Sequence, residues 1–138
     1  MTSLKLFFAI CSFMMAATFG SANDHSMRRP PIDRMNQEAP IVRIAELEID
    51  PAQLHAYLTA LKQEIRASIR DEAGVLALYA VTVKGEPNQI RIFEKYANQS
   101  AYESHLQSPH FQKYKHETQG MIKALKLIET EPILLGSK

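Results

Sequence analysis

The 138-residue chain has little cysteine, no tryptophan and no long run of one charge. Its single cysteine, Cys11, lies in an N-terminal segment that we expect to be removed, so the mature protein would have no disulfide, no thiol nucleophile and no thiolate metal ligand. The 16 Lys and Arg residues balance 15 Asp and Glu residues without forming a basic stripe, which argues against a nucleic-acid partner.

Several common catalytic motifs are also missing. The chain has no Gly-Lys-Ser/Thr phosphate loop, no dinucleotide glycine fingerprint, no Gly-x-Ser-x-Gly elbow and no His-Glu-x-x-His pair. Nucleotide-binding, serine-hydrolase and zinc-peptidase activities therefore have no support in the sequence. The composition, 46% hydrophobic and 22% charged, is that of one ordinary globular domain.

The N-terminal residues have the pattern of an export signal. Lys5 precedes the apolar stretch 6–19, and small residues follow at 20–22. We predict that residues 1–22 are a cleaved signal peptide, which makes the protein periplasmic or secreted and leaves it without stable membrane insertion. The alternative is a retained anchor, but a helix needs about 20 apolar residues to cross a bilayer and this stretch is shorter.

The remainder divides into an arm and a domain. Residues 23–40 contain three prolines and almost no apolar periodicity, which predicts an extended N-terminal arm. Residues 41–138 contain no internal repeat, so we expect them to form a single domain.

Strand and helix patterns alternate along this domain. Asp50-Pro51 predicts the start of an amphipathic helix and Gly74 its end, while Ser100 and Ser108-Pro109 predict the starts of two further helical segments. The predicted strands are 41–49, 75–83, 89–96 and 125–133. This order is typical of an α+β fold of the ferredoxin-like split βαβ type, in which helices cover one face of an antiparallel sheet.

The second predicted strand is apolar on both faces. One face carries Val75, Ala77, Tyr79 and Val81, and the other Leu76, Leu78 and Ala80. Because helices cover only one face of such a sheet, the pattern predicts a homodimer in which two sheets pack together. The alternative is a monomer in which longer loops cover the strand.

A few polar side chains fall on apolar faces. Glu94 and Tyr96 share a strand face with two isoleucines, and His105 lies on the apolar side of its helix. Two interpretations stay open: these are core residues satisfied by hydrogen bonds, or they are proton-transfer groups in a cavity. His105, His110 and His116 lack the i, i+4 spacing of a helical metal pair, so we predict no metal site.

The pattern resembles the antibiotic-biosynthesis monooxygenase (ABM) domain over about residues 41–134. The shared residues are Glu72-Ala73-Gly74, Glu94-Lys95-Tyr96, Ala101, His105 and Ser108-Pro109-His110-Phe111. The resemblance implies a dimeric α+β barrel of ferredoxin-like subunits. It also implies a quinol-monooxygenase-like activity, in which dioxygen oxidises a small phenol, quinol or polyketide-like aromatic without a cofactor.

The same resemblance implies roles for individual residues. His105 would be the base or orienting group, with Glu94 and Tyr96 as its partners. The implied substrate pocket consists of Tyr79, Ile92, Ala101 and Phe111.

The sequence departs from the family pattern in places. Tyr96 stands where many members carry Trp. The haem-degrading branch has a Trp where His105 falls, a ligand His where Lys115 stands and an Asn near Leu47, so haem degradation is not expected, although His116 leaves weak haem binding open. The alternative function is a non-catalytic dimeric protein of the exported compartment that binds a small ligand such as haem or a quinone.

Overall fold

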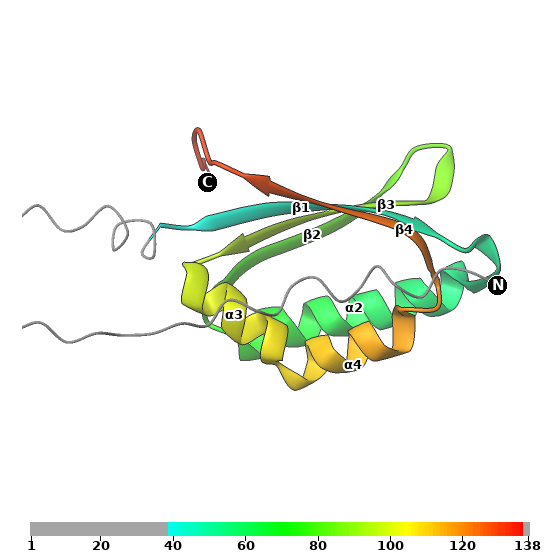
Figure 1. The fold of residues 1–138 in the computed structure, drawn as a ribbon, viewed down its shortest axis with the longest axis horizontal. Helices are drawn as coiled ribbons and strands as arrows, with labels where there is room; N and C mark the ends of the chain where they lie inside the picture. The colour runs from blue at the N-terminus through cyan, green and yellow to red at the C-terminus, as the bar shows by residue number, and fades with distance from the viewer. Residues whose placement is uncertain (1–38, 137–138) are drawn as a thin grey trace, which may run out of the picture.

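The structure, a computed structural model, describes residues 39–136 (Figure 1). The predicted signal peptide at 1–22 lies outside the described residues, as does the predicted arm at 23–40 except for its last two positions. Figure 1 shows one sheet with its helices gathered on one side. Within the described part of the chain, no helix has the length and apolar character needed to cross a bilayer.

The architecture is the predicted α+β ferredoxin-like fold. Four antiparallel strands lie in the order β2-β3-β1-β4, so the crossover from β1 to β2 spans β3. The elements along the chain are β1 (Ile41–Ile49), η1 (Pro51–Gln53), α2 (Leu54–Asp71), β2 (Val75–Val83), β3 (Glu86–Tyr96), α3 (Gln99–Gln107), α4 (Pro109–Thr118) and β4 (Ile122–Thr130). The long helix α2 and the pair α3–α4 together cover one face of the sheet.

Side-chain caps fix where the helices begin. The Asp50 carboxylate accepts a hydrogen bond from the Ala52 N–H at 3.0 Å, which confirms the predicted start of the first helical segment. Ser108 caps α4 as predicted, since its Oγ accepts from the Phe111 N–H. The cap of α3 is Asn98 rather than the predicted Ser100, because α3 begins at Gln99, two residues earlier than a cap at Ser100 would place it.

Gly74 does not end α2 as a left-handed cap. The helix ends at Asp71, and the only glycine with a positive φ among the described residues is Gly85, in the turn between β2 and β3. Gly74 is instead needed for close packing, since a Cβ there would lie 2.5 Å from the Cβ of Ala101 on α3. The missing side chain lets α3 approach the start of β2.

The last strand lies three residues earlier than predicted. β4 runs from Ile122 to Thr130, because the carbonyl of Met121 already accepts the Asp50 N–H at the far end of β1. Pro132 follows the strand and has no N–H to continue the ladder.

Because β2 contains a bulge, the predicted division of its side chains between the two faces is wrong. Val75 pairs with Tyr96, but the next pair joins Ala77 to Lys95, so the alternation shifts by one residue. Val75 and Leu78 consequently lie on the same, helix-covered face, and both are buried.

The two faces of the sheet therefore differ. The core lies between the helix-covered face and α2: the sheet contributes Ala45, Leu47, Ile49, Ile90 and Ile92, and α2 contributes Tyr57 and Leu61. On the other face, the register aligns one apolar side chain from each strand in a continuous row, which we call the open-face row: Tyr79, Phe93, Ile44 and Ile128.

Candidate functional site

The end of β3 brings a carboxylate and a phenol into the helix-covered interior. The Tyr96 hydroxyl donates a hydrogen bond to Glu94 Oε2 at 3.0 Å, and Tyr96 is fully buried. Burial raises the pKa of the Glu94 carboxyl, more than the hydrogen bond from Tyr96 lowers it. Burial, and then the neighbouring Glu94 carboxylate, raise the pKa of the Tyr96 phenol strongly. The pair is thus held in a water-poor environment.

His105 of α3 lies against this pair. Its ring centroid is 5.3 Å from that of Tyr96 and 4.7 Å from that of Phe111, and the residue is 3% exposed. Nδ1 lies 2.9 Å from Glu72 Oε1, and Nε2 lies 3.7 Å from Glu64 Oε1. The imidazole therefore sits between two carboxyl groups, one at each ring nitrogen.

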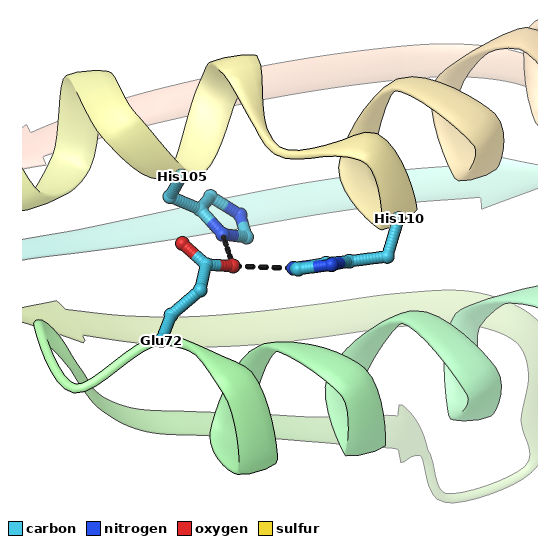
Figure 2. A group of neighbouring side chains, drawn as sticks. All are labelled: Glu72, His105 and His110. Atoms are coloured by element: carbon cyan, nitrogen blue, oxygen red, sulfur yellow. Dashed lines mark hydrogen bonds and ion pairs between the residues drawn. The ribbon is translucent and has the colours of Figure 1, made fainter.

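Glu72, just after α2, is shared by two histidines (Figure 2). Its Oε1 is 2.9 Å from His105 Nδ1 and 2.5 Å from His110 Nε2. Burial alone would raise the pKa of Glu72, but the hydrogen bonds and charges of the two imidazoles outweigh it and lower the pKa. Because an ionised carboxylate can only accept, each ring carries a proton on the bonded nitrogen. In neutral His105 the nitrogen with a free lone pair is therefore Nε2.

Further polar groups continue the cluster along α2. Glu64 is buried, its Oε1 accepts from the Ser68 hydroxyl at 2.6 Å, and burial raises the pKa of its carboxyl. The hydroxyls of Tyr57 and Tyr114 lie 2.7 Å apart, and burial raises the pKa of Tyr57 to about 12. Every fully buried side-chain nitrogen or oxygen among the described residues has a hydrogen-bond partner.

A groove opens between α2 and the edge strand β2, and none of His105, Glu94 and Tyr96 lines it. Its volume is about 580 Å³, and apolar side chains such as Leu58, Leu61 and Ile65 line it. Leu78, which also lines it, is the cross-strand partner of Glu94, and Ile65 packs against the core that contains Tyr96. The groove is of the size that small-molecule sites have.

The model of one protein family, antibiotic biosynthesis monooxygenase, matches residues 40–117, which is more than half of the chain. The chain belongs to this family. A crystal structure of a proposed antibiotic biosynthesis monooxygenase from Bacteroides thetaiotaomicron is 46% identical, with 74% of this chain and 97% of that chain covered and a TM-score of 0.70. No curated protein matches.

This ABM chain is also similar to other solved structures that are named as monooxygenases. A proposed monooxygenase from Lactobacillus acidophilus is 31% identical, with 66% of this chain and 43% of that longer chain covered and a TM-score of 0.64. A proposed antibiotic biosynthesis monooxygenase from Nitrosomonas europaea, 16% identical over 68% of this chain and 99% of its own, shows the fold alone, with a TM-score of 0.65.

The ABM fold brings some of the predicted site residues together and separates others. His105, Glu94 and Tyr96 converge, with Phe111 against the His105 ring. Ile92 is buried on the same face, whereas Ala101 packs onto Gly74. Tyr79 lies in the open-face row and is 67% exposed; it is among the residues that line the groove but does not contact the predicted catalytic group.

Three residues of the cluster, Glu64, Glu72 and His110, were not predicted as site residues. Glu64 follows the apolar residue Leu61 by three positions, and Ser68 follows Glu64 by four. This helical spacing would have indicated an inward carboxylate. Glu72 and His110 entered only as parts of the family pattern. Spacing within one helix could not detect their meeting, because they lie on different elements.

Proposed function

We propose that this ABM protein is a cofactor-independent monooxygenase that uses dioxygen to oxidise a small phenol, quinol or polyketide-like aromatic. The observation that carries the proposal is the convergence of His105, Glu94 and Tyr96 in one buried cluster beside an apolar groove. Buried titratable groups next to a cleft are typical of functional sites. The substrate would bind in the groove, and to reach His105 it would have to displace Ile65, which lines the groove and packs against the core that contains Tyr96.

His105 supplies the base in this proposal. Glu72 holds the Nδ1 proton, so Nε2, which lies 3.7 Å from Glu64 Oε1, has the lone pair that would accept the proton of a substrate hydroxyl. The hydrogen-bonded Glu94–Tyr96 pair lies against the same imidazole and would orient the substrate oxygen. Each group is fixed by packing on a helix or a strand, which favours a defined geometry.

The proposed reaction balances without a cofactor. A hydroquinone that loses its phenolic proton becomes electron-rich enough to reduce dioxygen directly. One oxygen atom enters the ring, the other leaves as water, and the product is a hydroxyquinone. All four electrons come from the substrate, so no separate reductant is consumed.

We further propose that the protein is an exported homodimer. The open-face row exposes large apolar side chains, with Phe93 at 44% and Tyr79 at 67%. A second copy whose sheet packs on this face would cover them. Export rests on the signal-like pattern of residues 1–22.

A second candidate function is a small-ligand-binding protein without turnover, with haem or a quinone as the ligand. It is favoured by one observation: the fully buried polar side-chain atoms of residues 39–136 are already hydrogen-bonded to protein partners. Such a site would hold an apolar ligand in the groove without acting on it.

The deciding experiment measures oxygen uptake by the full chain, after treatment with a chelator, on a panel of hydroquinones and phenols. His105→Gln keeps an amide that can donate to Glu72 but has no base, and we expect it to lose at least about 100-fold in rate. His116→Gln is the matched control, because His116 is exposed on α4. Uptake at the autoxidation rate in the unmodified protein would favour the binding protein.

A further inference from the structure

We infer that Glu72, His105 and His110 form a binding site for a divalent transition-metal ion of the zinc class. Glu72 Oε1, His105 Nδ1 and His110 Nε2 lie within 4.8 Å of one another (Figure 2). Two imidazole nitrogens and one carboxylate oxygen are a ligand set that Zn²⁺ and its first-row neighbours bind.

The geometry needs little rearrangement to accept an ion. Metal–ligand bonds of about 2.0–2.2 Å place the ligand atoms of one ion about 3–4 Å apart. Oε1 is now 2.9 Å from one nitrogen and 2.5 Å from the other, with a proton in each gap. Replacing those protons by one ion requires Oε1 to separate from each nitrogen by about 1 Å or less.

The buried carboxyl of Glu64 lies behind one of the proposed ligands, His105, at ion-pair rather than hydrogen-bond distance. Once a metal occupies Nδ1 of His105, the proton of that neutral ring lies on Nε2, which faces Glu64 Oε1 at 3.7 Å. Ser68 fixes this buried carboxyl through a hydrogen bond at 2.6 Å. A carboxylate behind a ligating imidazole is the usual arrangement around protein-bound zinc. This contact is independent of the three ligand atoms themselves.

The site is accessible from solvent. Glu72 and His110 line a surface cleft between the end of α2 and the α3–α4 corner, together with Ser104, Ser108 and Asp71. An ion can therefore enter, and water can complete its coordination. The ligands come from α2's end, α3 and α4, so the ion would link these three elements.

A metal ion in this site would inhibit the proposed oxidation, an expectation that rests on the proposed function. A metal on Nδ1 places the remaining proton of neutral His105 on Nε2, so the ring can no longer accept one from the substrate. Zinc is then expected to inhibit oxygen uptake, and a chelator to restore it.

The test is a calorimetric titration of the full chain with ZnCl₂, and with CoCl₂ for absorption spectra that report imidazole ligation. We expect one Zn²⁺ per chain at this site. His110→Gln should weaken binding at least about 100-fold, and Glu64→Gln about tenfold through loss of the supporting carboxylate. The matched control His116→Gln, on an exposed histidine of the same helix, should bind as the unmodified protein does.

The outcomes separate this inference from the proposed function. Equal zinc affinity in the unmodified protein and His110→Gln, or no binding in either, overturns the metal site. Zinc binding that His110→Gln abolishes supports it whether or not any substrate is oxidised. If zinc binds there and oxygen uptake is undiminished, the metal site stands and the role of His105 as base fails.

Discussion

The two faces of the sheet distribute polarity in opposite ways. Between the helix-covered face and its helices, Glu64 and His105 are buried and Glu94 is half-buried among apolar side chains. The open face exposes an apolar row that includes Tyr79 and Phe93. A chain under selection for the stability of a lone subunit would favour the reverse arrangement.

The difference indicates that each face serves something beyond folding. Buried carboxyls and an imidazole cost desolvation energy, so their convergence beside a groove points to chemistry. Exposed aromatic and branched side chains in one row point to a surface that another protein covers. The covered face is thus the candidate for catalysis and the open face the candidate for association.

The largest change that we expect is a fall in the free energy of unfolding at high pH, caused by the buried Tyr57 phenol. The pKa of Tyr57 rises from 10.0 unfolded to about 12 folded, so the fold favours the neutral phenol. Its stabilisation is complete below pH 10 and is lost as pH rises from 10 to 12, in total about 3 kcal/mol. Urea unfolding at several pH values should show this fall. Tyr57→Phe should make the fall smaller by about that amount, and an unchanged pH dependence would contradict the burial.

A second prediction tests how tightly the covered face is packed. Gly74→Ala places a Cβ 2.5 Å from that of Ala101, and should lower the free energy of unfolding by about 1–3 kcal/mol. Gly120→Ala is the control, since no atom lies within 4 Å of its added Cβ. In an Ala101→Gly background the cost of Gly74→Ala should shrink below about 0.5 kcal/mol. Equal costs in the two backgrounds would show that the close approach is not the cause.

The smallest effect on subunit stability is expected on the open face. Phe93→Glu should convert a dimer to a monomer in light scattering while leaving the circular dichroism spectrum unchanged, because the side chain is 44% exposed in the lone subunit. Gln63→Glu introduces the same charge on the exposed side of α2 and should keep the dimer. A dimer that survives Phe93→Glu, or an unmodified protein that is already monomeric, would remove the association role.

The fold was largely predictable from local signals. Asp50-Pro51 and Ser108-Pro109 mark helix starts with both a cap and a first-turn proline, and the strand alternation around Ile90 and Ile92 defines a face. The β2 bulge was not predictable, because Val75 and Leu76 are both apolar and either could face inward. The role of Gly74 depends on where α3 lies, which its neighbours in sequence do not encode.

The candidate site was predicted only in part, for a similar reason. His105, Glu94 and Tyr96 carry a signal in their own segments, as polar residues on apolar faces. Glu72 and His110 meet His105 only through the packing of α2 against the α3–α4 corner. Contacts between residues on different elements leave no periodic pattern in the sequence, so they could not be predicted from it.

Isotopically labelled dioxygen shows whether the residues on the covered face insert oxygen into an aromatic substrate. The chelator-treated full chain would be incubated with a hydroquinone under the label, and the product and water analysed by mass spectrometry. We predict one labelled atom in the product and one in water, and the loss of both in His105→Gln. A product without label, or labelled hydrogen peroxide in stoichiometric yield, would contradict it.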